Sequence, residues 1–300
     1  MGAKLLAMLR TGIAAASLSV LFLVSGAAQS VQAASSRSRE GTTEVTTGPV
    51  PNLEGYDIYR PTDLNAVHHK LPVVAWANGG CVRANSPWAP LFDAWVKAGF
   101  LVVAIGPPPG ATSATFSTVA DQDKIVDWAY SENSPKGSPY HDRIDLKGIV
   151  AAGNSCGGVS SVQLAAQDHR VNAVFVLSGS STLPGTPESK TASIMDDVHV
   201  PIGYVEGGPT DISVPQSNLD YTLVPKGVPM YQAHRFSGDH VTISLGVLPE
   251  DAQISTKWIE FSLYGGRKLE QQLLTDPCQS CAPGTWTVRA KNLSGLASRH

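Results

Sequence analysis

The sequence of 300 residues has few charged side chains and no long basic run. Charged residues make up 16% of the chain, and 22 Lys and Arg against 25 Asp and Glu give a formal net charge of -3. Proteins that bind nucleic acid or an anionic membrane surface carry concentrated positive charge. The absence of such a run excludes nucleic acid and anionic membranes from the expected partners.

The apolar N-terminal segment lacks a following cysteine, which excludes a lipid-anchored form. Residues 1–33 start with Lys4 and Arg10, continue with an apolar stretch and end at Ala33, a pattern typical of a cleaved secretory signal. A retained membrane anchor is the alternative, but the apolar stretch is short for a span. We expect a secreted protein, extracellular or periplasmic, whose mature chain has no membrane span and begins with a flexible segment over 34–50.

The main part of the chain, residues 51–275, has no internal repeat and no second domain boundary. Strand-like and helix-like segments alternate along it, which is typical of a mostly parallel sheet with helices on both faces, so we predict an α/β fold. The short connection between the strands near 177 and 202 leaves no room for a large cap domain. We expect strands at 56–59, 71–77, 101–105, 149–152, 173–177, 202–205 and 230–233, with an edge strand starting near 44–47. We expect helices at 88–98, 119–130, 159–167 and 250–264, the last of these closing the chain.

A Gly-x-Ser-x-Gly sequence lies between an expected buried strand and an expected helix. It consists of Gly153, Ser155 and Gly157 with one residue in each gap. This pattern is typical of a nucleophile elbow, a tight turn in which glycines allow the strand and helix backbones to approach closely. An ordinary glycine-rich turn is the alternative. The strand before and the helix after it favour Ser155 as a catalytic nucleophile at the positive end of a helix.

A nucleophilic serine needs a base to accept its proton and an acid to orient that base. Of the eight histidines, His240 lies in a loop past the carboxyl end of the last expected strand, where active sites of parallel sheets lie. Asp211 is the preferred acid, since it lies in a Gly/Pro loop that follows the strand at 202–205. Glu206 and Asp220 are the alternatives.

Two backbone amides are expected to bind the oxyanion of an acyl-transfer transition state. One belongs to Cys156, the residue after the predicted nucleophile. The other lies in the glycine-rich loop directly after the strand at 71–77, where Gly80 is preferred and Cys81 is its neighbour.

The four cysteines allow three pairings, and export would permit disulfides. In the predicted fold Cys81 and Cys156 both flank the oxyanion hole, so we expect a bridge between them that locks the two donor segments together. Cys278 and Cys281 would then form a local clip in a C-terminal tail over 276–300. A metal or redox role for that pair is the alternative, but no His or Cys partners cluster nearby, and we expect no metal and no cofactor.

With these residues placed, the chain resembles the α/β-hydrolase superfamily, in particular the secreted single-domain branch of cutinases, polyester hydrolases and polyhydroxybutyrate depolymerases. The resemblance covers roughly 56–291 and implies an α/β-hydrolase fold with a triad of Ser155, Asp211 and His240 acting on esters. Polyester hydrolases usually have an aromatic residue or His where this chain has Asn154, and Met where it has Cys156. The motifs that carry the resemblance are 78–81, 153–158, 207–211, 239–240, 278–281 and 286–288.

The predicted function is a secreted serine hydrolase that cleaves carboxylic esters, small or polymeric, through an acyl-enzyme intermediate. An amidase or peptidase on the same fold is an alternative, because the triad geometry is shared between these reactions. A non-catalytic secreted binding module is another alternative, although it would have no chemical need for all three triad residues. The sequence does not indicate an oligomeric state.

Overall fold

A sheet of nine strands runs through the part of the chain that the computed structural model describes, residues 43–107, 110, 115–245, 248–279 and 281–299. The expected signal over 1–33 lies outside the described residues. The strand order is β1-β2-β4-β3-β5-β6-β7-β8-β9. The strands are β1 (Val45–Pro49), β2 (Tyr56–Pro61), β3 (Leu71–Ala77), β4 (Leu101–Ile105), β5 (Ile144–Asn154), β6 (Ala173–Leu177), β7 (Ile202–Glu206), β8 (Met230–Arg235) and β9 (Trp286–Lys291).

The strands from β4 to β8 in this order are parallel, and the strands at both edges are antiparallel. Every residue of β3, β4 and β6 is buried, as expected for central strands that are covered on both faces. The prediction of a mostly parallel sheet is therefore confirmed.

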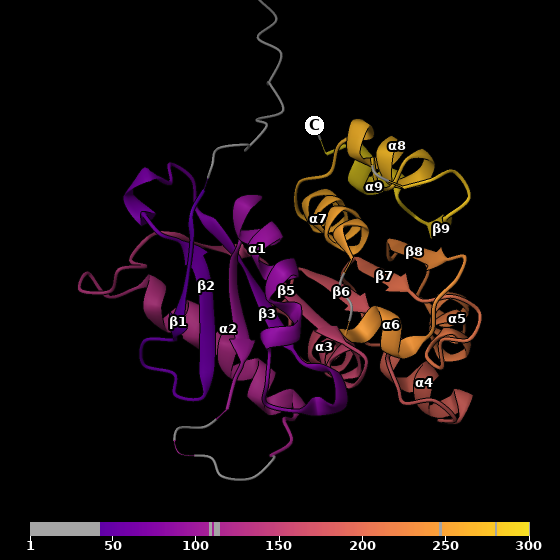
Figure 1. Cartoon of the computed structure of the whole chain (residues 1–300), viewed down its shortest axis with the longest axis horizontal. Helices are drawn as coiled ribbons and strands as arrows, with labels where there is room; N and C mark the ends of the chain where they lie inside the picture. Colours follow the sequence, from indigo (N-terminus) through magenta and orange to yellow (C-terminus); the bar gives the residue numbers. More distant parts are fainter. Residues whose placement is uncertain (1–42, 108–109, 111–114, 246–247, 280, 300) are drawn as a thin grey trace, which may run out of the picture. The chain divides into compact units, whose positions relative to one another are not determined.

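Helices cover both faces of this sheet (Figure 1). One core contains side chains of α2 and α3 packed on β3 and β5, and the other contains side chains of α1 and α7. The helices are α1 (Ala89–Lys97), α2 (Val119–Asn133), α3 (Cys156–Gln167), α4 (Glu188–Met195), α5 (Val214–Leu223), α6 (His240–Leu245), α7 (Pro249–Tyr264), α8 (Arg267–Thr275) and α9 (Ser294–Ala297), with short 3-10 turns η1 (Leu64–Ala66), η2 (Gly79–Cys81) and η3 (Ser86–Trp88). The prediction of an α/β protein with helices on both faces is confirmed.

Glycine in β7 allows helix α7 to pack closely on the sheet. A Cβ atom added to Gly203 would lie 2.3 Å from Trp258 Nε1, so a larger residue would push the indole away. The indole is fully buried, and its N–H donates to the carbonyl of Val174 at 3.0 Å. The hydrogen bond removes the cost of burying that donor and fixes the helix against β6.

The C-terminal region differs from the expectation that the helix at 250–264 closes the chain. Helix α7 is followed by α8, by β9, which pairs antiparallel with β8, and by α9. The alternation in β9 is incomplete because its residues are half-buried or exposed, as at an edge strand, which weakens the sequence signal. Among the described residues, no helix is both long and apolar enough to span a membrane.

The connection between β6 and β7 contains one helix, α4, of 8 residues. This agrees with the expectation of a short connection there. Because β3, β5, β6, β7 and β8 are parallel, their carboxyl ends share one edge of the sheet. The loops that leave this edge carry the residues of the candidate site.

Candidate active site

Ser155 forms the turn between β5 and α3, and its backbone is in the left-handed region with φ 50°. Such a conformation costs a non-glycine residue on the order of 1–3 kcal/mol. The two neighbouring glycines are required because a side chain would clash with nearby backbone. A Cβ on Gly157 would lie 2.0 Å from the carbonyl oxygen of Ala77, and one on Gly153 would lie 2.3 Å from the carbonyl carbon of Gly157. The turn thus has the strained, closely packed geometry expected from the sequence.

The structure brings together Ser155, His240 and Asp211, which lie on β5–α3, α6 and the loop after β7. Ser155 Oγ lies 2.8 Å from His240 Nε2, and His240 Nδ1 lies 2.7 Å from Asp211 Oδ1. An ionised carboxylate can only accept a hydrogen bond, so Nδ1 carries the proton. Nε2 is then free to accept the hydrogen of the serine hydroxyl, as a general base requires.

Asp211 is 1% exposed and is surrounded by donors. Burial alone would raise the pKa of this carboxyl, but the hydrogen bonds that it accepts outweigh burial and hold its pKa well below the ordinary value. It is therefore ionised at neutral pH. The donors are His240 Nδ1, Ser178 Oγ, the amide of Gly207 at 3.0 Å, and the amide and hydroxyl of Ser213 at 3.0 and 2.8 Å.

The two alternative acids, Glu206 and Asp220, are buried in the same region but do not contact His240 in the described structure. Glu206 is fully buried, and both its burial and the nearby charge of Asp211 raise its pKa well above the ordinary value. Burial likewise raises the pKa of Asp220 to about 6, although Ser181 donates to it through its amide at 2.7 Å. Of the three carboxyl groups, Asp211 is the one placed to orient the imidazole.

The segment predicted to bind an oxyanion, called the oxyanion loop here, is η2 (Gly79–Cys81), and it lies against the elbow. Gly80 and Cys81 have φ values of 60° and 53°, so two successive residues are left-handed. In the described structure no hydrogen bond engages the amide of Gly80 or that of Cys156, the first residue of α3. Both predicted amides are thus unoccupied, and Cys81 and Cys156 form the expected disulfide with a Cα–Cα distance of 5.3 Å.

Two polar residues beside the triad were not predicted. Ser178 follows β6 directly, donates its hydroxyl hydrogen to Asp211 Oδ2, and has its oxygen 3.1 Å from His240 Nδ1. Ser213 Oγ lies 2.8 Å from both Asp211 Oδ1 and Glu206 Oε2. Ser178 could have been found from the sequence, because it is the first polar residue after a buried parallel strand, and the ends of such strands converge.

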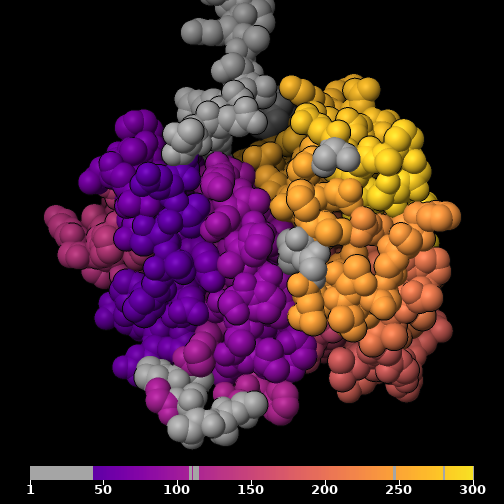
Figure 2. Space-filling view, viewed as in Figure 1, coloured from indigo at the N-terminus to yellow at the C-terminus, as the bar shows by residue number. Residues whose placement is uncertain are grey.

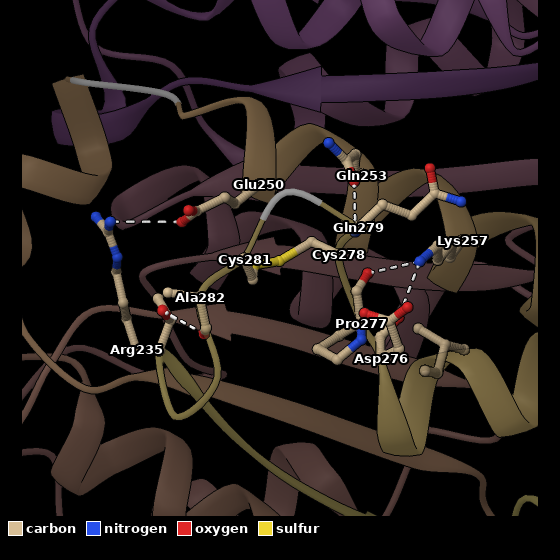
Figure 3. The surroundings of a disulfide bond; sticks show 12 residues. Arg235, Glu250, Gln253, Lys257, Asp276, Pro277, Cys278, Gln279, Cys281 and Ala282 are labelled. Carbon is tan, nitrogen blue, oxygen red and sulfur yellow. Dashed lines mark hydrogen bonds and ion pairs between the residues drawn. A yellow bond between two sulfur atoms is a disulfide. The ribbon is translucent and has the colours of Figure 1, made fainter.

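The second disulfide, between Cys278 and Cys281, holds the chain between α8 and β9 (Figure 3). Nearby, Lys257 Nζ donates to the carbonyls of Asp276 and Pro277 at 3.0 and 2.9 Å. The expected clip is present, and the two hydrogen bonds of Lys257 fasten the segment after α8 to α7.

An ion pair beside this clip joins the end of β8 to the start of α7, and His240 lies in the segment between them (Figure 3). Arg235, the last residue of β8, lies 3.4 Å from Glu250, near the start of α7, with side chains 21% and 19% exposed. Because α6 lies between them in sequence, this pair holds together the two anchored ends of the segment.

No protein-family model matches this chain. No curated protein sequence matches it significantly either. Within the described residues, no group of three or more His, Cys, Asp or Glu side chains is arranged to hold a metal ion.

Several exposed apolar side chains, called the apolar rim here, follow the carboxyl ends of parallel strands, the edge of the sheet that carries Ser155. Orange residues of the α6 region are visible at the surface in Figure 2. Phe236 and Val241, on either side of the loop that leads to His240, are 76% and 60% exposed. Large exposed side chains of this kind are also found at Val82, Phe116, Leu183, Ile212 and Leu245. Apolar side chains at the same sheet edge as Ser155 suit a substrate whose reactive group is attached to apolar parts.

Proposed function

We propose that this protein is a secreted serine hydrolase with an α/β-hydrolase fold that cleaves carboxylic esters through an acyl-enzyme intermediate. The single observation that carries the proposal is the hydrogen-bonded chain from Ser155 Oγ through His240 to an ionised Asp211, built on a strained strand-to-helix turn. Buried aspartates, histidines and serines meet in many structural networks. A serine held in a left-handed turn, with its hydroxyl on an imidazole, is typical of nucleophilic catalysis.

The proposed reaction starts with a proton on His240 Nδ1 and none on His240 Nε2, as inferred above from the carboxylate of Asp211. Ser155 Oγ attacks the ester carbonyl carbon while His240 Nε2 accepts the hydroxyl proton, and the carbonyl π electrons move to oxygen. The unoccupied amides of Gly80 and Cys156 donate to this oxyanion, each contributing roughly 3 kcal/mol to the transition state. The carbonyl then re-forms and the bond from the acyl carbon to the alcohol oxygen breaks as the imidazolium gives its proton to that oxygen, so the alcohol leaves and the acyl group stays on Ser155.

Water completes the cycle by the same steps in reverse order. His240 Nε2 removes a proton from water, hydroxide adds to the acyl carbon, and collapse of the intermediate expels Ser155 Oγ as the proton returns to it. During both steps Asp211 stabilises the imidazolium. Its five hydrogen-bond donors keep it ionised, so it does not take the proton itself.

The favoured substrates are esters whose acyl or alkyl parts are apolar. The rim side chains described above are apolar and exposed, and the connection after β6 contains only the 8 residues of α4 as regular structure. A site without a large covering segment accepts small esters as well as a chain end or loop of a polymer.

The test is active-site labelling together with turnover of model substrates. A fluorophosphonate should modify Ser155 alone, as located by peptide mapping, and nitrophenyl esters of graded acyl length should be hydrolysed. Ser155→Ala should lose both reactions. Ser160→Ala is the matched control, because Ser160 is a buried serine of the same helix, 5% exposed, and should retain both.

Labelling at another residue, or normal ester turnover by Ser155→Ala, would refute the proposal. A parallel series of nitrophenyl anilides separates ester from amide hydrolysis, since an amidase would turn over the anilides at a comparable rate.

A further inference from the structure

Asn154, directly before the proposed nucleophile, is fully buried and contacts other segments of the site. Its Nδ2 group donates to the carbonyl of Leu177 at the end of β6 at 2.8 Å, and to Ser244 Oγ on α6 at 3.1 Å. A side-chain amide has two N–H donors, so both are used. The amide therefore fastens the turn before Ser155 to β6 and to α6.

The hydrogen bond from Asn154 to Ser244 on α6 lies next to the hydrogen bond between Ser155 and His240. Ser244 follows His240 by one helical turn, so the two side chains lie on the same face of α6. Ser155 meets His240 at 2.8 Å, and Asn154 meets Ser244 at 3.1 Å. Two consecutive residues of the elbow thus hold two residues one turn apart on the helix, which fixes the rotation of α6 about its axis.

Besides these two contacts, the rotation of helix α6 depends on the hydrogen bond of His240 to Asp211 and on the burial of Ile243 in the core. It has 6 residues, well below the length at which an isolated helix is stable, so it depends on tertiary contacts. Val241 and Leu245 are 60% and 61% exposed, and Ile243 and Ser244 are its buried residues. A rotation would move His240 away from Ser155, and a displacement of about 1 Å can cost roughly 100-fold in rate.

The oxygen of the same amide packs against the oxyanion loop. A Cβ on Gly79 would lie 2.2 Å from Asn154 Oδ1, so glycine is required for this approach. Within the described residues, Asn154 Oδ1 has no hydrogen-bond partner although it is buried. An unpaired buried oxygen is unfavourable, so the gain from this side chain lies in its Nδ2 bonds and in its packing on the loop.

We propose that Asn154 is a positioning residue that holds α6 and the oxyanion loop in register with Ser155. The inference rests on the proposed function. It predicts an effect on kcat rather than on KM, because the Asn154 side chain is fully buried and so positions other groups of the site without contacting the substrate. The contact that carries most of the effect is the one to Ser244.

The test compares Ser244→Ala, Asn154→Leu and the double variant in ester turnover and in the rate of fluorophosphonate labelling. Loss of one neutral hydrogen bond should lower kcat and the labelling rate about five-fold in Ser244→Ala, with KM unchanged. Ser244→Thr keeps the hydroxyl and should restore both rates. In the Asn154→Leu background, Ser244→Ala should cause no further loss, since its partner is already gone.

Ser255→Ala is the matched control for a purely structural effect. Ser255 is a fully buried serine on α7 whose hydroxyl accepts a hydrogen bond from Trp95 Nε1 at 3.0 Å. Its loss should lower the free energy of unfolding and leave kcat unchanged.

Unchanged kcat in Ser244→Ala, or additive losses in the double variant, would overturn the inference. If Asn154→Leu does not fold, the pair Ser244→Ala and Ser244→Thr decides the question alone. Failure of the proposed function gives a different result, namely a wild-type protein that does not label at Ser155.

Discussion

The buried carboxyl group of Glu206 should make the stability of the protein depend on pH with a sign opposite to that of an ordinary ion-paired carboxylate. Glu206 is fully buried at the end of β7, and the acidic groups that bear on it are Asp211 and Asp220. Its register partner on β8 is His234, whose pKa is lowered by burial to about 4, so that imidazole is neutral at pH 7. Burial and the charge of Asp211 raise the pKa of Glu206, so the folded protein keeps this carboxyl protonated to a higher pH than the unfolded chain does.

The hydrogen bonds around Ser213 agree with a protonated Glu206. Ser213 Oγ lies 2.8 Å from both Glu206 Oε2 and Asp211 Oδ1, but a hydroxyl has one hydrogen and cannot donate fully to both. If Glu206 carries a proton, it donates to Ser213, and Ser213 donates to Asp211. The protonated side chain then supports the ionised one through a single hydroxyl.

The magnitude follows from the linkage between protonation and folding. An unfolded chain releases the Glu206 proton near pH 4.3, whereas the folded chain retains it, so unfolding releases one proton above that pH. The contribution of Glu206 to stability is complete below pH 4.3 and is lost at about 1.4 kcal/mol per pH unit until the raised pKa is reached. Each pH unit between the unfolded and the raised folded pKa of Glu206 thus removes about 1.4 kcal/mol, a sizeable part of the roughly 5–15 kcal/mol of a typical protein.

The assay is denaturant unfolding of wild type and Glu206→Gln at several pH values from 5 to 8, with both disulfides intact. Glutamine has a similar shape and keeps a donor for Ser213, but it does not titrate. The free energy of unfolding of Glu206→Gln should rise relative to wild type by about 1.4 kcal/mol per pH unit until the raised pKa of Glu206 is reached. Asp220→Asn is the buried comparator, and its difference should level off near pH 6, the raised pKa of Asp220.

A flat difference between Glu206→Gln and wild type would show that Glu206 is ionised in the folded protein and would refute this reasoning. The pH profile of kcat/KM gives an independent check. A neutral Glu206 predicts the same acid limb in Glu206→Gln, whereas removal of a negative charge would shift that limb to lower pH.

Three further predictions concern the elbow and the acid. Replacing Cys81 and Cys156 together by serine opens a loop with a sequence separation of 75 and should lower the free energy of unfolding by about 4 kcal/mol in denaturant titrations. Gly157→Ala places a Cβ 2.0 Å from the carbonyl oxygen of Ala77 and should prevent soluble folding, as seen by circular dichroism; a stable variant would contradict the packing described here. Asp211→Asn should lower kcat roughly 10³–10⁴-fold with small change in KM, because the imidazole loses the acceptor that fixes its tautomer.

The sequence predicts the central strands and the order of the elements well, because buried parallel strands have an unmistakable apolar run. Leu71–Ala77 is apolar throughout, and the structure buries all of it in β3. Edge elements are predicted less well. Strand β9 is half-exposed, and α8 lies at the surface with Leu273 as its buried residue, so neither has a strong apolar pattern.

The choice among carboxyl groups shows what the sequence cannot give. Glu206 ends β7, and Asp211 and Asp220 follow this strand, but composition alone does not say which of the three turns toward the histidine. The turn is determined by hydrogen bonds within the loop, such as the one from the amide of Gly207 to Asp211 Oδ2 at 3.0 Å. The hydrogen bonds of Ser178 to Asp211 and of Asn154 to Ser244 likewise join segments that are distant in sequence, so no local pattern predicts them.

Three consecutive residues of the elbow join the parts of the candidate site. Asn154 holds β6 and α6, Ser155 meets His240, and Cys156 is bonded to the oxyanion loop through Cys81. The left-handed backbone at Ser155 is strained, so it persists only where surrounding contacts determine it. Because these contacts reach His240 and the oxyanion loop, loss of any one of them should disturb the others. We therefore expect the elbow, α6 and the oxyanion loop to open as one cooperative unit, with similar hydrogen-exchange protection at their backbone amides and a common loss of protection in Ser244→Ala.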